Sequence, residues 1–250
     1  MRGNAFSGHY FTRMPRNART VAVGLAYHIT QRGTNREKVF HSVADRQLYL
    51  RLIAENQKEA GVRVLVYCLM SNHVHLVVVP EREDSLALLF GRANGRYAQA
   101  ANIRRGRSGH LWQARYFSCA MSESHLWTAV SYVERNPCRA GLVERPEGYR
   151  WSSAAVHLNG VADRSGILDL RFYEQAGGQR RWRQVHAEAG SEERVAQLRR
   201  CTYSGKPYGE EAFVAAMEEQ FRRRWRRSKQ GPEPPFSTKS APAGVPEPGF

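Results

Sequence analysis

Residues 62–80 have the sequence VRVLVYCLMSNHVHLVVVP, and this stretch decides how the rest of the chain is interpreted. Aliphatic and β-branched residues predominate on both sides of a short polar connection. This pattern predicts two strands, residues 62–69 and 74–79, joined by a tight turn, and Pro80 ends the second strand.

The second of these strands carries a pair of histidines. Successive side chains of a strand alternate between faces, so His73 and His75 are expected to point the same way and Val74 the opposite way. Two imidazoles on one face can share a divalent metal ion, or they can be half-buried hydrogen-bonding histidines. The pair alone leaves both interpretations open, because metal ligation usually needs a third partner.

The flanking sequence alternates between strand and helix patterns. The predicted elements are a strand in 21–30, a helix in 45–60, the two strands above, a helix in 85–102, a strand in 110–121 and a helix in 122–136. Elements of this length, with one tight strand connection, favour the α+β class. We expect a ferredoxin-like antiparallel sheet with helices packed on one face.

The composition points to a polyanionic partner. The 250 residues include 38 Lys+Arg and 23 Asp+Glu, a formal charge of +15, so nucleic acid is the leading expectation. No apolar run is long enough to span a membrane, and the N-terminus lacks the apolar core of a signal peptide. We therefore expect a cytoplasmic, nucleoid-associated protein. The four cysteines form no Cys-x-x-Cys pair and are expected to be reduced thiols.

Changes in composition divide the chain into four segments. Residues 1–20 are polar, basic and aperiodic and are expected to form a flexible arm, and residues 21–157 hold the strand and helix pattern. Residues 158–230 are predicted to be a basic, mainly helical extension. Residues 231–250 are rich in Pro, Gly and Ser and are predicted to be disordered.

The helix predicted for residues 122–136 carries a second chemical signal. Tyr132 falls outside its apolar stripe, and Asn136 follows one turn later, so a phenol and an amide can face one point in space. A tyrosine near a metal-binding histidine pair and arginines suggests nucleophilic attack on phosphate. Two simpler interpretations stay open at this stage: Tyr132 can be a packing residue, and Asn136 can be an ordinary helix-ending residue. Tyr97 is the main rival nucleophile, although its apolar neighbours favour a core role.

Three separated blocks carry a resemblance to a known family. They are SNHVHL at residues 71–76, NGRY at 94–97 continuing to GHLWQARY at 109–116, and SYVERNPCRAGLV at 131–143. Together they resemble REP-associated tyrosine transposases of the single-tyrosine HUH superfamily, in which HUH stands for His, hydrophobic, His. The resemblance covers roughly residues 14–156.

The resemblance implies an HUH-type tyrosine transposase domain in residues 21–157. It implies cleavage and strand transfer of single-stranded DNA through a 5′-phosphotyrosine intermediate, on hairpins formed by repetitive palindromic elements. By position, Tyr132 matches the family's nucleophile, and His73, His75 and Asn136 match its ligands for Mg²⁺ or Mn²⁺. Two imidazoles and an amide suit manganese better than magnesium. Both a monomer and a homodimer, with Tyr132 used in trans, stay open.

Electrostatics adds candidate DNA contacts, because arginines neutralise phosphates and aromatic rings stack on unpaired bases. The arginines are Arg32, Arg36, Arg104, Arg105, Arg107, Arg135 and Arg139, and the aromatic candidates are Trp112, Tyr116 and Trp182. Two other functions remain in view. One is a non-catalytic nucleic-acid-binding module of the same fold, and the other is a metal-dependent hydrolytic nuclease that leaves no protein on the DNA.

Overall fold

The computed structural model describes residues 20–188 and 190–225. The predicted N-terminal arm, apart from Thr20, and the predicted C-terminal tail lie outside the described residues. Within them, no helix is long and apolar enough to cross a membrane.

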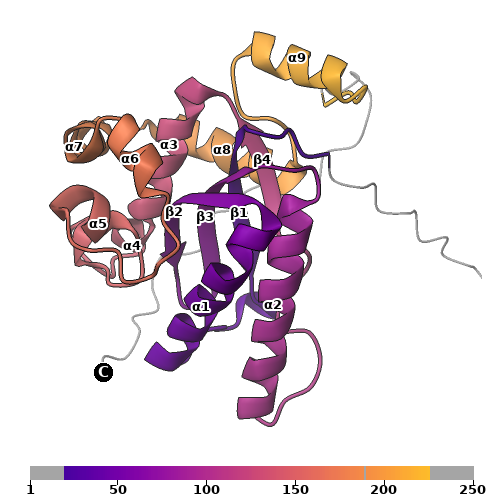
Figure 1. Ribbon diagram of the computed structural model, residues 1–250, viewed down its shortest axis with the longest axis vertical. Helices are drawn as coiled ribbons and strands as arrows, with labels where there is room; N and C mark the ends of the chain where they lie inside the picture. Colours follow the sequence, from indigo (N-terminus) through magenta and orange to yellow (C-terminus); the bar gives the residue numbers. More distant parts are fainter. Residues whose placement is uncertain (1–19, 189, 226–250) are drawn as a thin grey trace, which may run out of the picture.

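Four antiparallel strands form the centre of the molecule in the order β2-β3-β1-β4 (Figure 1). They are β1 Ala26–Arg32, β2 Val62–Leu69, β3 His73–Pro80 and β4 Phe117–Met121. The strand predicted for 110–121 begins only at Phe117. The preceding residues instead pair with the end of β1 and the loop after it: Gln113 N donates to Arg32 O at 2.9 Å, and Thr34 N donates to Leu111 O at 3.0 Å.

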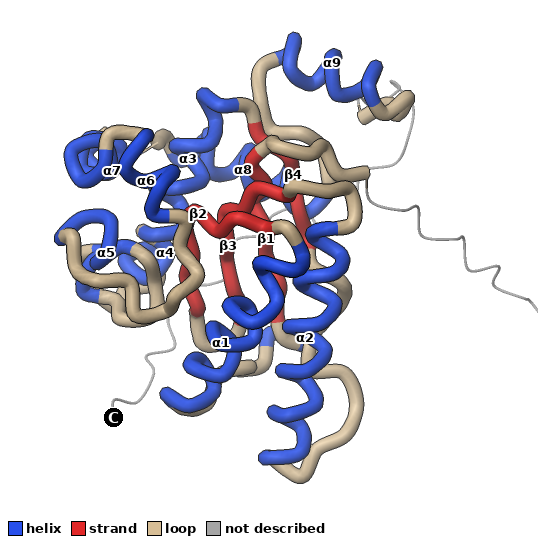
Figure 2. The backbone as a smooth tube through the Cα atoms, in the orientation of Figure 1, coloured by secondary structure: helices blue, strands red, loops and turns tan. Residues whose placement is uncertain are grey.

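Helices α1 (Val43–Ala60) and α2 (Ser85–Arg104) cover one face of the sheet (Figure 2). A capping box starts α1, since Ser42 and Asp45 satisfy each other's backbone N–H groups. Gly61, in the left-handed region with φ of 61°, ends it as expected for a C-terminal glycine. Fully buried apolar side chains, including Ile29, fill the space between these helices and the sheet.

The opposite face of the sheet has its own core and its own helices. Helix α3 (Glu123–Glu134) and helix α8 (Glu192–Ser204) pack on it, together with α7 (Gly178–Ala187). The predicted α+β class and antiparallel sheet are confirmed. The prediction of helices on one face is incomplete, because α3 and the C-terminal helix α8 pack on the second face.

Six further elements complete the described part of the chain. They are the short helices α4 (Asn136–Arg139), α5 (Ala154–Asn159) and α6 (Leu170–Gln175), the helix α9 (Glu211–Gln220), and two 3-10 turns, η1 (Thr34–Arg36) and η2 (Pro146–Gly148). Tyr208, between α8 and α9, extends the edge of β4. Its N–H donates to Ala120 O at 2.8 Å, and Ser122 N donates to its carbonyl at 3.0 Å.

A buried carboxylate ties α3 to the C-terminal helices. Glu134 is completely buried and accepts hydrogen bonds from Ser153 Oγ at 2.6 Å, His157 Nδ1 at 2.6 Å and His186 Nε2 at 2.8 Å. Burial opposes ionisation of Glu134, but the two histidines outweigh it and lower its pKa to about 2. The end of α3, which carries Tyr132, is therefore held in place by α5 and α7.

Candidate functional site

The histidine pair lies at the start of β3, one of the two central strands. His73 is half-buried opposite Arg32 in β1, and His75 is buried opposite Thr30. Their ring centroids are 4.9 Å apart with the rings nearly perpendicular, at 86°. The two imidazoles therefore share the face that α3 and α8 cover.

Hydrogen bonding leaves Nε2 of His73 free to act as a ligand. Asn72 Nδ2 donates to Arg36 O at 3.0 Å, which orients the Asn72 amide and turns its oxygen toward His73. That oxygen lies 2.5 Å from His73 Nδ1, so Nδ1 carries the ring proton. Neutral His73 then presents the lone pair of its Nε2.

Hydrogen bonds that run from His75 through His28 to Thr202 leave Nε2 of His75 free in the same way. Thr202 Oγ1 donates its proton to Leu198 O at 2.8 Å, so it accepts from His28 Nδ1 at 2.7 Å. His28 Nε2 is then an acceptor, and it lies 3.0 Å from His75 Nδ1. We assign the proton of His75 to Nδ1, which leaves its Nε2 lone pair available.

The environment keeps all three imidazoles neutral near pH 7. Burial, with the Arg199 cation, lowers the pKa of His28 to about 3. Burial, with Arg32 and Arg199, lowers the pKa of His73 to about 4, and the pKa of His75 falls well below its usual value for the same causes and the neighbouring histidines. A neutral imidazole is the form that binds a metal ion.

The ring of Tyr132 on α3 packs edge-on against the rings of His28 and His75. Its ring centroid is 5.3 Å from that of His75 and 5.6 Å from that of His28. Only 6% of Tyr132 is exposed, so the prediction that it lies outside the apolar stripe is corrected: the ring is part of the second core. Its hydroxyl oxygen, however, accepts from Nε of the exposed Arg199 at 3.2 Å and is not sealed in hydrocarbon.

Asn136 lies just beyond a break in the helix. Helix α3 ends at Glu134, Arg135 follows with φ of −84° and ψ of 0°, and Asn136 begins the short helix α4. Asn136 is 8% exposed, and its Nδ2 is a buried donor without a partner. No hydrogen bond or ring contact in the described part of the chain joins it to the histidine pair. Over the same residues, no group of three or more His, Cys, Asp or Glu could hold a metal.

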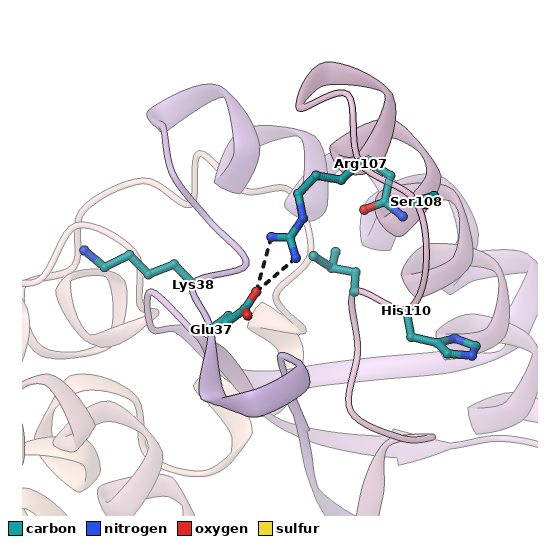
Figure 3. A pocket seen from close by; sticks show the side chains of 7 residues that line it. Glu37, Lys38, Arg107, Ser108 and His110 are labelled. Atoms are coloured by element: carbon teal, nitrogen blue, oxygen red, sulfur yellow. Dashed lines mark hydrogen bonds and ion pairs between the residues drawn. The ribbon is translucent and has the colours of Figure 1, made fainter.

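Several of the predicted DNA-binding arginines are engaged within the protein. Arg104 pairs with Asp45 at 2.7 Å, and Arg139 pairs with Glu192 at 3.0 Å. Figure 3 shows the Arg107 guanidinium reaching Glu37, to which both terminal nitrogens donate at 3.2 Å. These guanidinium charges are partly offset by carboxylates before any DNA arrives.

The other four predicted arginines differ in their surroundings. Arg135 donates to the carbonyl of His186 at 2.9 Å, and Arg105 donates to the carbonyl of Ala101 and contacts His41. Arg32 has a buried Nε without a partner. Arg36 is exposed and sits in a left-handed conformation with φ of 63°.

The predicted stacking aromatics are all buried. Trp112 is 9% exposed and donates to Asn94 O, Tyr116 is 6% exposed, and Trp182 is fully buried. They pack in the protein cores and present no face to a base, so that prediction is wrong. Tyr97 is also fully buried, with its hydroxyl donating to Val39 O at 2.6 Å, which confirms its core role.

Three residues of the candidate site, His28, Arg199 and Thr202, were not predicted from the sequence. His28 lies in a strand that was predicted from its apolar content, and its polar side chain among apolar neighbours was a usable signal. Thr202 and Arg199 come from α8, 67 residues or more beyond Tyr132. No local pattern in a basic helix indicates which residues it places against a distant strand.

Comparisons with known proteins found a family model and solved structures that are similar to part of this chain. Residues 21–136 match the family model described as "Transposase IS200 like". A solved REP-associated tyrosine transposase bound to a REP hairpin is similar over 58% of this chain and 86% of that chain, with a TM-score of 0.51 and 17% identity. A putative transposase from Deinococcus radiodurans R1 is similar over 48% of this chain and 96% of that chain, with a TM-score of 0.34 and 22% identity.

No curated protein matches the sequence. At 17% identity, the likeness to the first solved structure supports the fold alone. The matched segment contains β1 to β4, both histidines of β3, Tyr132 and Asn136, whereas α8 lies outside it. Residues 21–136, slightly less than half of the chain, are therefore similar to the IS200-like transposase family.

Proposed function

We propose that this chain cleaves single-stranded DNA and transfers it to a new end through a 5′-phosphotyrosine bond to Tyr132. One observation carries the proposal. A tyrosine ring from α3 lies 5.3 Å, centroid to centroid, from one of two neutral histidines on β3, inside a segment that matches a transposase family. A nucleophile beside two available imidazole nitrogens is the combination that phosphoryl transfer requires.

The proposed reaction exchanges one phosphodiester bond for another. Tyr132 Oη attacks the phosphorus, the bond from phosphorus to the 3′ oxygen of the upstream nucleotide breaks, and the phosphate remains on the 5′ oxygen of the downstream nucleotide. The phenol loses one proton and the departing 3′ oxygen gains one. Attack by the 3′ hydroxyl of a second strand reverses these changes and frees Tyr132. Because the bond energy is kept in the phosphotyrosine, rejoining needs no external energy source.

The residues present fit a divalent metal ion. The Nε2 atoms of His73 and His75 are unprotonated, and the side-chain oxygen of the buried Asn136 is the candidate third ligand. This mixed nitrogen and oxygen set favours Mn²⁺ over Mg²⁺. A bound ion would neutralise charge on the scissile phosphate. The chain's own part is to keep both imidazoles neutral and to hold the Tyr132 ring against them.

The proposed substrate is a hairpin formed by a palindromic repeat in the nucleoid. The excess of positive charge and the likeness of the fold to a REP-associated tyrosine transposase solved on a REP hairpin support this proposal. Arg36, exposed beside the histidine pair's loop, is the strongest of the seven candidate phosphate contacts. A homodimer that uses Tyr132 in trans fits the same chemistry as a monomer.

A labelled hairpin oligonucleotide incubated with the full chain and Mn²⁺ tests the proposal. We expect a DNA–protein adduct that survives denaturation, together with a product ending in a free 3′ hydroxyl. Tyr132→Phe should abolish the adduct, while Tyr203→Phe, at an exposed tyrosine of α8, should form it normally. DNA cut without attached protein would indicate a hydrolytic nuclease. Binding without cutting would indicate a non-catalytic module.

A further inference from the structure

Helix α8 lies outside the matched family segment, yet it packs directly against the catalytic face. Val195, Leu198 and Thr202 are buried in the second core, where α8 contacts β4, β1 and α3. Arg199 follows Val195 by four residues and precedes Thr202 by three, so it lies on the same side of the helix. The packing of α8 therefore sets the position of Arg199.

Arg199 touches the atom that would react. Its Nε donates to Tyr132 Oη at 3.2 Å, and its guanidinium carbon lies 5.3 Å from the centroid of the Tyr132 ring. The residue is exposed, so the guanidinium borders both the buried phenol and the solvent from which DNA would approach. This is the only hydrogen bond that the Tyr132 hydroxyl makes within the described residues.

The charge of Arg199 is available to a ligand. Arg139 lies over the same ring, with its guanidinium carbon 5.8 Å from the centroid, but it is bound to Glu192 through two N–H groups at 3.0 and 3.3 Å. No carboxylate in residues 20–188 and 190–225 pairs with Arg199. Its terminal nitrogens also have no acceptor there, so two fork-like donors remain for an anion.

On the basis of the proposed function, we propose that Arg199 is a catalytic residue supplied by the C-terminal extension. Its Nε–H stabilises negative charge on Tyr132 Oη when the phenol gives up its proton, and again when that oxygen leaves during strand rejoining. Its terminal N–H groups bind a non-bridging oxygen of the scissile phosphate. Both contacts become stronger as negative charge develops on these oxygens in the transition state. Interactions that are stronger in the transition state than in the bound substrate lower the activation barrier.

Full-length Arg199→Ala, Arg199→Lys and Arg200→Ala variants test this role. Arg200 is the adjacent exposed arginine of α8 and controls for loss of one positive charge. We measure the single-turnover rate of adduct formation with saturating hairpin DNA and Mn²⁺. Removing one preorganised donor of this kind costs about 100-fold in rate. We expect that loss for Arg199→Ala, a smaller loss for Arg199→Lys and the wild-type rate for Arg200→Ala.

Added guanidinium ion separates a chemical role from a structural one. A slow Arg199→Ala variant that regains rate in millimolar guanidinium supports the proposal. Equal rates for Arg199→Ala and Arg200→Ala overturn it. A slow variant that guanidinium does not restore also overturns it, because Arg199 would then serve only to hold the fold. If the wild type forms no adduct, the proposed function is wrong. If the wild type forms the adduct and the rate does not depend on Arg199, only the role proposed for Arg199 is wrong.

Discussion

His28 Nε2 and His75 Nδ1 lie 3.0 Å apart, and the two imidazole rings are stacked with centroids 5.2 Å apart. Because Thr202 fixes the proton of His28 on Nδ1, His28 accepts from His75 and keeps the other nitrogen of His75 unprotonated. A residue outside the proposed ligand set thereby determines which atom of His75 can bind a metal. Partners of this kind usually change metal affinity by 10- to 100-fold.

Replacing His28 should therefore weaken metal binding before any DNA is involved. His28→Phe keeps a ring of similar size but leaves His75 Nδ1 without its acceptor. We expect Mn²⁺ affinity, measured by calorimetry on the full chain, to fall by about 10- to 100-fold. His110→Phe, in an exposed loop, is the control and should bind Mn²⁺ as the wild type does. Equal affinities for the two variants would contradict the assigned role of His28.

The stability of the protein should fall as the solution becomes mildly acidic. The pKa values of His28 and His73 are about 3 and 4 in the folded protein, against about 6.5 for an unfolded histidine. As the pH falls, His28 and His73 therefore bind protons in the unfolded chain before they do so in the folded protein. The stability gained by keeping these histidines neutral in the folded state is complete above pH 6.5 and is lost as the pH falls toward 4. Each such histidine adds a slope approaching about 1.4 kcal/mol per pH unit to the free energy of unfolding.

Urea denaturation of the metal-free protein between pH 4.5 and 8 measures that slope. His28→Gln removes one of the titrating groups, so its free energy of unfolding should depend less steeply on pH than that of the wild type. His110→Gln should retain the wild-type slope. A His28→Gln profile parallel to the wild type across this range would show that His28 is not held neutral by burial.

The buried Glu134 should be costly to neutralise. Glu134→Gln keeps the shape of the side chain but leaves two histidines without their shared carboxylate. Breaking a buried ionic arrangement by removing one partner costs about 3–5 kcal/mol, whereas Glu144→Gln, at an exposed site, should change stability by less than about 0.5 kcal/mol. Both values come from urea denaturation at pH 7. A loss below about 1 kcal/mol for Glu134→Gln would mean that this network does not secure α3.

The arginines should contribute unequally to DNA binding. Arg36 is exposed and has no acidic partner among the residues that the structure describes, whereas Arg107 is already bound to Glu37. Each phosphate contact adds about 0.7–0.9 to the slope of log affinity against log salt. Arg36→Ala should therefore reduce that slope by nearly this amount in hairpin binding titrations, and Arg107→Ala by less than half of it. A larger reduction of the slope for Arg107→Ala than for Arg36→Ala would indicate that DNA displaces Glu37 from Arg107.

The sheet could be predicted from sequence because its strands carry local signals. The bounds of β2 follow from its aliphatic run and those of β3 from the histidine pair and Pro80, and both agree with the structure to within one residue. His73, His75 and Tyr132 were chosen as candidate site residues from the same local patterns and from the family resemblance, and the structure brings their rings together. The environments of side chains were harder to predict. Trp112 and Trp182 were expected to stack on bases, but both are buried, and their burial depends on segments that are distant in the chain.

The part contributed by α8 could not be predicted for the same reason. Arg199 is one of several arginines in a basic, weakly patterned helix, and only its packing against α3 distinguishes it from Arg200. The hydrogen bond from His28 to Thr202 likewise joins residues that are 174 positions apart in the sequence. Spacing along the sequence carries no information about such contacts.

Peptide mapping of the covalent adduct identifies the residue that attacks the DNA. After reaction of the wild-type chain with the hairpin and Mn²⁺, nuclease and protease digestion leave a short nucleotide on whichever residue attacked the phosphate, and tandem mass spectrometry locates it. We expect a 5′-phosphate ester on Tyr132. A nucleotide attached to any other residue, or cleaved DNA with no modified peptide, would contradict it.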